Sequence, residues 1–316
     1  MSHESPETFA DQVRAIPGGE HLEMCYSCGT CVSKCLIQQK VEPEYNPRRL
    51  LRMVMMGLRE EAFRSPTTWL CSACDLCYPA CPQQIHISGV IGAVKQLAIE
   101  AGYESPLETV SVDETLCSGC GICVMACPYE ALHLVEKEIE GEMDLVSEVD
   151  ANKCLGCGIC VAACPLGAIS RPGISNQEVV AQIEVPTDGA PRLITFVCDW
   201  CLRADDDVSL LESYPDNVRV IHIPCSGRID PQMALLALRS GIDGVLVCGC
   251  APGECHYKRG TYVSSCKISL LNRMFDQMNV GDGRVRFVQI GTQDRGCIRT
   301  EVDAMLEYLA AWKEAQ

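Results

Sequence analysis

The chain has 316 residues, of which 47% are apolar and 5% aromatic, and its formal net charge is −16. A protein with this charge repels a phosphate backbone, so the composition disfavours nucleic-acid binding and favours docking on basic surfaces of partner proteins. The length allows two or three domains.

The termini and apolar stretches give no sign of export or membrane insertion. Residues Met1 to Gly19 are polar and lack the apolar core of a signal peptide. The longest apolar candidate for a membrane span, Met233 to Ala251, is interrupted by Arg239 and Asp243. We therefore expect a cytoplasmic protein. Thiols stay reduced in that compartment, so the 24 cysteines are not expected to form a disulfide scaffold.

The first region, residues 1–105, is predicted to be a helical module with two cysteine runs. Between the runs, Asn46 is a good N-cap and Pro47 suits the first helical position, and the helical pattern stops near Ser65. A second helix is predicted from Ser88 to Glu100. Both runs have the spacing Cys-x-x-Cys-x-x-Cys-x-x-x-Cys. They comprise Cys25, Cys28, Cys31 and Cys35, and Cys71, Cys74, Cys77 and Cys81.

The second region, residues 106–174, contains an internal repeat with the same cysteine spacing. The stretch from Asp113 to Leu132 matches the stretch from Asp150 to Ile169, and a proline follows the last cysteine of each. The acidic residues 136–148 between the two copies are predicted to form a solvated hairpin. The runs comprise Cys117, Cys120, Cys123 and Cys127, and Cys154, Cys157, Cys160 and Cys164.

This spacing indicates cubane [4Fe–4S] clusters, because two-residue gaps let three thiolates converge while a fourth comes from elsewhere. In two-cluster bacterial ferredoxins the fourth cysteine of each run ligates the other cluster. We expect the same crossing in both pairs of runs. The predicted ligand sets are Cys117, Cys120, Cys123 and Cys164; Cys154, Cys157, Cys160 and Cys127; Cys25, Cys28, Cys31 and Cys81; and Cys71, Cys74, Cys77 and Cys35. Zinc is the alternative, but its sites typically use two cysteine pairs.

The third region begins after residues 175–191, which are rich in Gly, Pro and polar residues and are predicted to be a linker. Residues 192–316 alternate buried strands with helices, which predicts an α/β domain with a parallel sheet. The expected strands are 193–197, 218–223, 244–247 and 285–290. The expected helices are 206–213, 231–240, 263–278 and 300–312.

Cysteines follow three successive strands of this predicted sheet. The carboxyl ends of parallel strands share one edge, so these cysteines are expected to meet there in a further metal centre. They are Cys198, Cys201, Cys225, Cys248, Cys250 and Cys255. Cys266 and Cys297 lie on predicted helices or beside them and are interpreted as packing residues. A structural role is the more natural interpretation of His256.

The three regions resemble known iron–sulfur proteins. Residues 20–100 resemble the small iron–sulfur subunit of heterodisulfide reductase, through Cys25-Tyr-Ser-Cys-Gly-Thr-Cys and Trp69-Leu-Cys-Ser-Ala-Cys. Residues 108–172 resemble a two-cluster bacterial ferredoxin. Residues 192–313 resemble the delta subunit of methyl-viologen-reducing [NiFe] hydrogenase. The motifs behind that likeness are Phe196-Val-Cys-Asp-Trp-Cys, Ile223-Pro-Cys-Ser-Gly-Arg and Gly249-Cys-Ala-Pro-Gly-Glu-Cys.

The resemblance implies an α+β multidomain protein with four [4Fe–4S] clusters and one [2Fe–2S] cluster. It places the [2Fe–2S] ligands among five cysteines, one more than the cluster needs: Cys198, Cys201, Cys225, Cys250 and Cys255. The implied partners are the flavin-containing and the disulfide-reducing subunits of heterodisulfide reductase, with a hydrogenase or formate dehydrogenase. The whole would be a large hetero-oligomer around flavin-based electron bifurcation.

The chain lacks the motifs of a reaction centre of its own. It has no adjacent Cys-Cys-Gly motif of the kind that reduces disulfides, and no Gly-x-Gly-x-x-Gly follows a strand, so nicotinamide and flavin sites are unsupported. We interpret it as an electron-transfer subunit of an oxidoreductase complex without catalytic residues. Two other functions stay open: a reductase whose active site is the C-terminal metal centre, and a zinc-bound scaffold.

Overall fold

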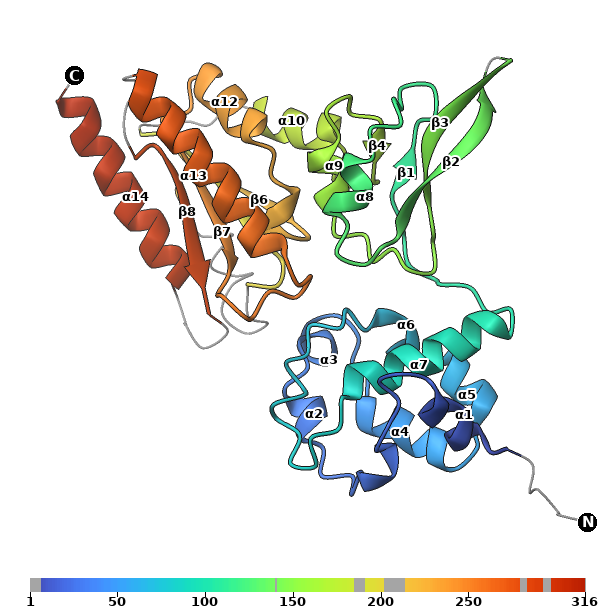
Figure 1. Ribbon diagram of the computed structural model, residues 1–316. Coiled ribbons are helices and arrows are strands. Elements are labelled where there is room, and N and C mark those ends of the chain that lie inside the picture. Colours follow the sequence, from blue (N-terminus) through green and yellow to red (C-terminus); the bar gives the residue numbers. More distant parts are fainter. Residues whose placement is uncertain are drawn as a thin grey trace, which may run out of the picture. The chain divides into compact units, whose positions relative to one another are not determined.

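The computed structural model describes residues 7–139, 141–184, 191–201, 214–278, 283–291 and 297–315 (Figure 1). The chain divides into two compact units, Met1–Leu107 and Glu108–Gln316. Within the described residues, no helix is long and apolar enough to cross a membrane.

The first unit is helical, as predicted. Asn46 caps the central helix by accepting a hydrogen bond from the Arg49 amide at 3.0 Å, and Pro47 takes the first helical position. That helix ends at Met55 rather than near Ser65, because Gly57 adopts a φ of +74° and turns the chain. The helices are α1 Phe9–Ala15, α2 Thr30–Ser33, α3 Leu36–Lys40, α4 Pro47–Met55, α5 Arg59–Arg64, α6 Pro66–Leu70 and α7 Ile87–Glu100, with a 3-10 turn, η1, at Leu22–Met24.

The second unit begins with a ferredoxin-like module. The predicted acidic hairpin is confirmed as an antiparallel pair of strands in which Glu136 lies opposite Leu145. A short antiparallel pairing of β1 with β4 joins the beginning of the module to its end. The elements are β1 Ser111–Val112, α8 Ile122–Ala126, β2 Leu132–Ile139, β3 Glu142–Val149, α9 Ile159–Ala163 and β4 Ile169–Ser170.

The C-terminal part of this unit has the predicted parallel sheet, with the strand order β6-β5-β7-β8. Helices α12 and α13 cover one face of the sheet and α14 covers the other (Figure 1). The expected helix at 206–213 lies outside the described residues. The elements are β5 Leu193–Cys198, β6 Val218–Ile223, η2 Ser226–Arg228, α12 Pro231–Arg239, β7 Gly244–Cys250, α13 Gly260–Met278, β8 Val285–Ile290 and α14 Cys297–Glu314.

The expected linker differs from the structure, because its first half is the helix α10, Asn176–Glu184. Val179 and Ile183, both 1% exposed, pack in the core beneath α12. Ser175 and Glu178 form a capping box, in which the Glu178 amide donates to the Ser175 hydroxyl at 3.2 Å and the carboxylate accepts from the Ser175 amide at 2.9 Å. The sequence pattern did not predict this helix because it is short and buries few side chains.

Replacing Ile183 by alanine tests this correction. Deleting a buried branched side chain leaves a cavity, so we expect the free energy of unfolding to fall by about 3 kcal/mol. Gln182→Ala, at the exposed neighbouring position, should leave it almost unchanged. Denaturant unfolding of the anaerobic chain, followed by circular dichroism, measures both. Equal shifts in the two variants would mean that α10 is not part of the core.

Candidate metal centres

The cysteines of the ferredoxin-like module form two groups, each around its own cavity. Cys117, Cys120 and Cys123 line one cavity together with Cys164 from the second copy of the repeat. Cys154, Cys157 and Cys160 line the other cavity together with Cys127 from the first copy. The structure therefore brings together the crossed sets that the repeat predicts.

The first unit has a comparable arrangement. Cys25, Cys28, Cys31 and Cys81 line one cavity, which combines three cysteines of the first run with the last cysteine of the second. The remaining set lies deeper. Burial raises the pKa of the Cys77 thiol, and the nearby thiols of Cys71, Cys74 and Cys35 raise it further. Tyr45 is buried beside this set and hydrogen-bonds Cys71.

Backbone amides point at sulfur in both halves of the ferredoxin-like module. The Ser147 amide donates to Cys117 Sγ at 3.4 Å, and the Ala131 amide donates to Cys127 Sγ at 3.4 Å. Such donors favour thiolate over thiol. Four cysteines around a cavity, with amides aimed at their sulfurs, fit the donor set of a [4Fe–4S] cluster.

The cysteines at the strand ends of the C-terminal sheet also converge. Cys198 Sγ lies 4.0 Å from Cys250 Sγ and shares hydrogen bonds with the thiols of Cys201, Cys225 and Cys250. The thiols of Cys225 and Cys255 are also within hydrogen-bonding reach of each other. Gly260 makes room for this group, because a Cβ there would lie 2.0 Å from Cys225 Sγ. All five cysteines implied as [2Fe–2S] ligands thus lie together.

The electrostatics of this centre favour anionic sulfur at two positions. Hydrogen bonds from Cys201, Cys225 and Cys250 hold the pKa of Cys198 well below its usual range. The bond from Cys225 lowers the pKa of Cys255 to about 6. The thiolate is the form of cysteine that binds metal, whereas the same hydrogen bonds raise the pKa of the donors Cys201, Cys225 and Cys250. Cys248 is fully buried, and its burial raises its pKa.

The C-terminal centre packs against the second cavity of the ferredoxin-like module. Cys157, from that cavity, and Cys225 are both buried in one cluster with Ile159 and Tyr257. Tyr129 packs against the same cluster. Its burial raises its pKa, and the nearby groups of Cys157, Tyr257, Cys225 and Cys255 raise it further. Trp200 covers the cluster and stacks on His256 with ring centroids 3.3 Å apart. The two candidate centres therefore share a continuous packed interior.

Arg228 joins the two modules at this place. Its side chain is fully buried, and its Nε and Nη2 donate to the Ile174 carbonyl at 2.9 and 2.7 Å. Nη2 also donates to Asn176 Oδ1 at 2.9 Å. Burial lowers its pKa to about 10, so it remains charged at neutral pH. Gly158 allows the approach, because a Cβ there would lie 2.8 Å from Arg228 Cδ.

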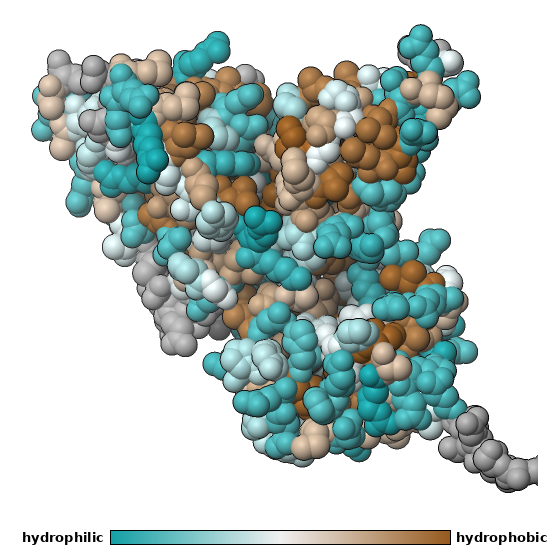
Figure 2. Space-filling model, viewed as in Figure 1, coloured by the Kyte–Doolittle hydropathy of each residue, from teal (hydrophilic) through white to brown (hydrophobic). Residues whose placement is uncertain are grey.

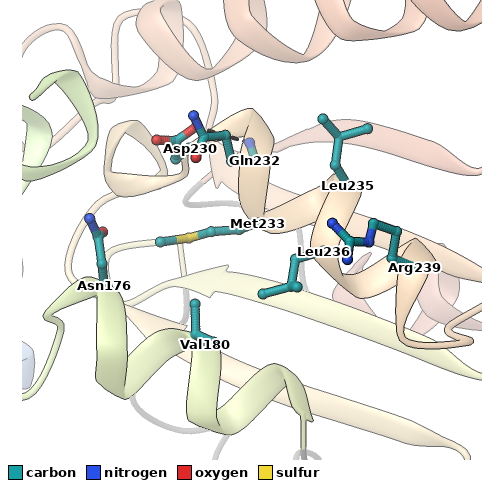
Figure 3. A pocket seen from close by; sticks show the side chains of 8 residues that line it. All are labelled: Asn176, Val180, Asp230, Gln232, Met233, Leu235, Leu236 and Arg239. Carbon is teal, nitrogen blue, oxygen red and sulfur yellow. Dashed lines mark hydrogen bonds between the residues drawn. The ribbon is translucent and has the colours of Figure 1, made fainter. Parts of the chain in front are cut away.

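A groove between α10 and α12 lies close to this contact (Figure 3). Val180, Met233, Leu235 and Leu236 form its apolar wall. Polar side chains complete the lining, namely Asn176, Asp230, Gln232 and Arg239. No cysteine contributes to it, so it is separate from the metal centres.

Comparison with known proteins agrees with this division of the chain. The family described as methyl-viologen-reducing hydrogenase, delta subunit, matches residues 193–312. Two 4Fe-4S dicluster domain families match residues 116–168 and 21–85. An iron–sulfur subunit of the F420-non-reducing hydrogenase of Archaeoglobus profundus is 37% identical over 128 residues, which cover 39% of this chain and 93% of the relative.

This chain belongs to the methyl-viologen-reducing hydrogenase delta subunit family. Its C-terminal domain carries the family likeness, and the predicted fusion with two dicluster modules is confirmed. The chain is thus an iron–sulfur protein of the hydrogenase and heterodisulfide reductase type.

Two further relatives match only part of their own length. One subunit of the ferredoxin:CoB-CoM heterodisulfide reductase of Methanosarcina mazei is 33% identical over 132 residues, which cover 40% of this chain and 17% of the relative. One subunit of the H2:CoB-CoM heterodisulfide,ferredoxin reductase of Methanothermobacter marburgensis is 33% identical over 98 residues, which cover 31% of this chain and 51% of the relative.

Sequence reasoning did not single out the residues between the centres. Tyr129 and Tyr257 carry no metal-ligand signature and become notable only through their packing. Arg228 stood within the Ile223-Pro-Cys-Ser-Gly-Arg motif, whose cysteine alone was given a role. The signal that could have drawn attention to Arg228 is its positive charge within a stretch of apolar and small residues.

Crossed ligation in the ferredoxin-like module can be tested by iron content. Changing Cys117, Cys120 and Cys123 to serine should remove one cluster and about four iron atoms per chain. Adding Cys164→Ser to this triple variant should cost no further iron, because Cys164 belongs to the cluster already lost. Adding Cys127→Ser instead should cost about four more. The opposite pattern would show that each run holds its own cluster.

Proposed function

We propose that this chain is a multi-cluster electron-transfer protein within a larger complex, with four [4Fe–4S] clusters and one [2Fe–2S] cluster. The clusters supply one-electron redox chemistry when bound, with potentials set by hydrogen bonds to sulfur and by burial. The ligands proposed for the cubanes are the four crossed sets described above. The [2Fe–2S] ligands are four of the five cysteines at the strand ends of the C-terminal sheet.

The burial of Cys157 and Cys225 in one packed cluster carries this proposal. Both cysteines are buried in the same cluster of side chains. Tyr129, Tyr257 and Ile159 fill the space around them and exclude water. Arg228 holds the backbone after the ferredoxin-like module against the C-terminal domain. Protein atoms thus form an unbroken path along which an electron could pass between the two centres.

The same burial favours a wire over a reductase. In the C-terminal centre all five cysteines are buried, Trp200 packs against the clusters that contain Cys198 and Cys225, and Tyr257 packs with Cys225. A small substrate would need an open position at the metal. A conduit needs only close packing to its neighbour, which the structure provides.

The relatives' names support a setting for this conduit. They are subunits of hydrogenases and of heterodisulfide reductases. We propose that the chain works in the cytoplasm in a large hetero-oligomer. It would link a hydrogenase or formate dehydrogenase to the flavin-containing and the disulfide-reducing subunits of a heterodisulfide reductase, in flavin-based electron bifurcation.

Iron, acid-labile sulfide and zinc per chain test the cofactor content of anaerobically purified protein. Four cubanes and one binuclear cluster predict about 18 iron atoms. About 16 would retain the cubanes and remove the C-terminal cluster. Stoichiometric zinc with little iron would contradict the electron-transfer proposal and indicate a zinc-bound scaffold.

Arg228→Met tests the path between the two centres. Losing the guanidinium leaves the buried Ile174 carbonyl without its donors and should weaken the contact between modules by about 2 kcal/mol. We expect unchanged iron content but a weaker magnetic interaction between the two reduced centres in electron paramagnetic resonance.

Lys267→Met is the matched control for this variant. Lys267 is a half-buried cation that donates to the Ile229 carbonyl at 3.1 Å, within the C-terminal domain. Its loss should leave the magnetic interaction as in the unaltered chain. An unchanged interaction in Arg228→Met would remove Arg228 from the path.

A further inference from the structure

The two cavities of the ferredoxin-like module differ in how close they lie to the surface. Cys154, Cys157 and Cys160 are buried, and their cavity adjoins the C-terminal domain. In the other cavity, Cys120 is exposed and Cys117 is half-buried. Of the four cysteines around the first of these cavities only Cys127 is half-buried, whereas the cavity with Cys120 is the more accessible to another protein.

Large apolar side chains surround the exposed cavity. Leu134 and Leu166 line it together with its four cysteines, and Leu166 is 53% exposed. Leu116 precedes Cys117 in the chain and is 52% exposed. Figure 2 shows brown, apolar surface over this module. A concentration of exposed apolar side chains of this kind is typical of an interaction site.

The hairpin extends this surface. The Ser147 hydroxyl accepts a hydrogen bond from the Cys123 thiol at 3.3 Å and Ser147 lines the cavity, so the face of β3 that carries the Ser147 side chain is turned toward the cavity. Strand alternation places Leu145 and Met143 on the same face, and both are exposed. We call this group the docking face. It consists of Leu116, Leu134, Met143, Leu145 and Leu166.

The docking face carries negative charge on one side. Glu136 lies directly opposite Leu145, and Glu138 lies directly opposite Met143, so both carboxylates share the face with the apolar residues. The hairpin's lysine, Lys137, is on the other face and bonds Glu114 at 2.7 Å and Glu148 at 2.9 Å. A partner that fits would therefore need basic residues beside an apolar centre.

We propose that the docking face binds a redox protein whose own centre lies near an apolar surface with a basic rim. One electron would pass between that centre and the cluster held by Cys117, Cys120, Cys123 and Cys164. The cluster is oxidised and the partner reduced, or the reverse. This inference rests on the proposed function, because it requires the cluster.

Cytochrome c is a suitable probe, since it is basic and has an apolar surface at its haem edge. The dithionite-reduced chain, freed of excess dithionite, would reduce ferric cytochrome c in a stopped-flow experiment, one electron per haem. We expect the second-order rate constant to fall steeply with salt. At low salt it should fall about tenfold in the double variant Glu136→Lys, Glu138→Lys.

Leu166→Lys tests the apolar part of the docking face and should also slow the reaction. Matched controls lie on other elements. Glu307→Lys with Glu314→Lys on α14 repeats the charge change at exposed positions, and Met274→Lys on α13 repeats the apolar change at a side chain that is 49% exposed. The controls should stay within about twofold of the unaltered chain.

Reduction of a small neutral quinone distinguishes failure of the electron-transfer function from failure of the docking face. If the reduced chain cannot reduce the quinone, or lacks the expected iron, the electron-transfer function itself fails. If all variants reduce the quinone equally and cytochrome c reacts equally with all of them, the clusters work and the docking face is wrong. Equal slowing in the docking variants and the controls would likewise overturn the docking face, because net charge alone would then explain the rates.

Discussion

Four sulfurs around one cage are the constraint on which this fold depends. A run of cysteines at two-residue gaps supplies three of them, and the chain must return from another run to supply the fourth. In the ferredoxin-like module, Cys164 and Cys127 make that return, and the pairing of β1 with β4 closes the two copies around the cavities. In the first unit, Cys81 returns to the cavity of the first run while α4, α5 and α6 fill the space between.

In the C-terminal domain a sheet brings the cysteines together. Its strands are parallel, so their carboxyl ends deliver cysteines to one edge without any regular spacing in the sequence. The loops at that edge also meet α9 and the segment after the ferredoxin-like module, where Arg228 is buried. Burying a charged group is costly unless it is fully hydrogen-bonded, and the carbonyl of Ile174 and the side-chain amide of Asn176 satisfy that need. The contact is therefore specific, and it fixes which two centres are neighbours.

The candidate centres of the second unit differ in their exposure to solvent. Those at Cys157 and Cys225 are enclosed by aromatic and apolar side chains, which exclude water. The cavity with Cys120 opens beside Leu134 and Leu166. This gradient from interior to surface suits the proposed electron conduit, and the proposed point of exchange with other proteins lies at the acidic hairpin.

The sequence by itself determined the metal chemistry, the crossed groups of cysteines that the structure brings around common cavities, and the parallel sheet. It could do so because ligand spacing and strand alternation are local patterns. It missed α10, whose core contact rests on Val179 and Ile183, and it assigned no role to Arg228, Tyr129 or Tyr257. Only the tertiary structure decided which ferredoxin-like centre adjoins the C-terminal one and which faces solvent. Burial and contacts between modules depend on residues far apart in the chain, and no local pattern records them.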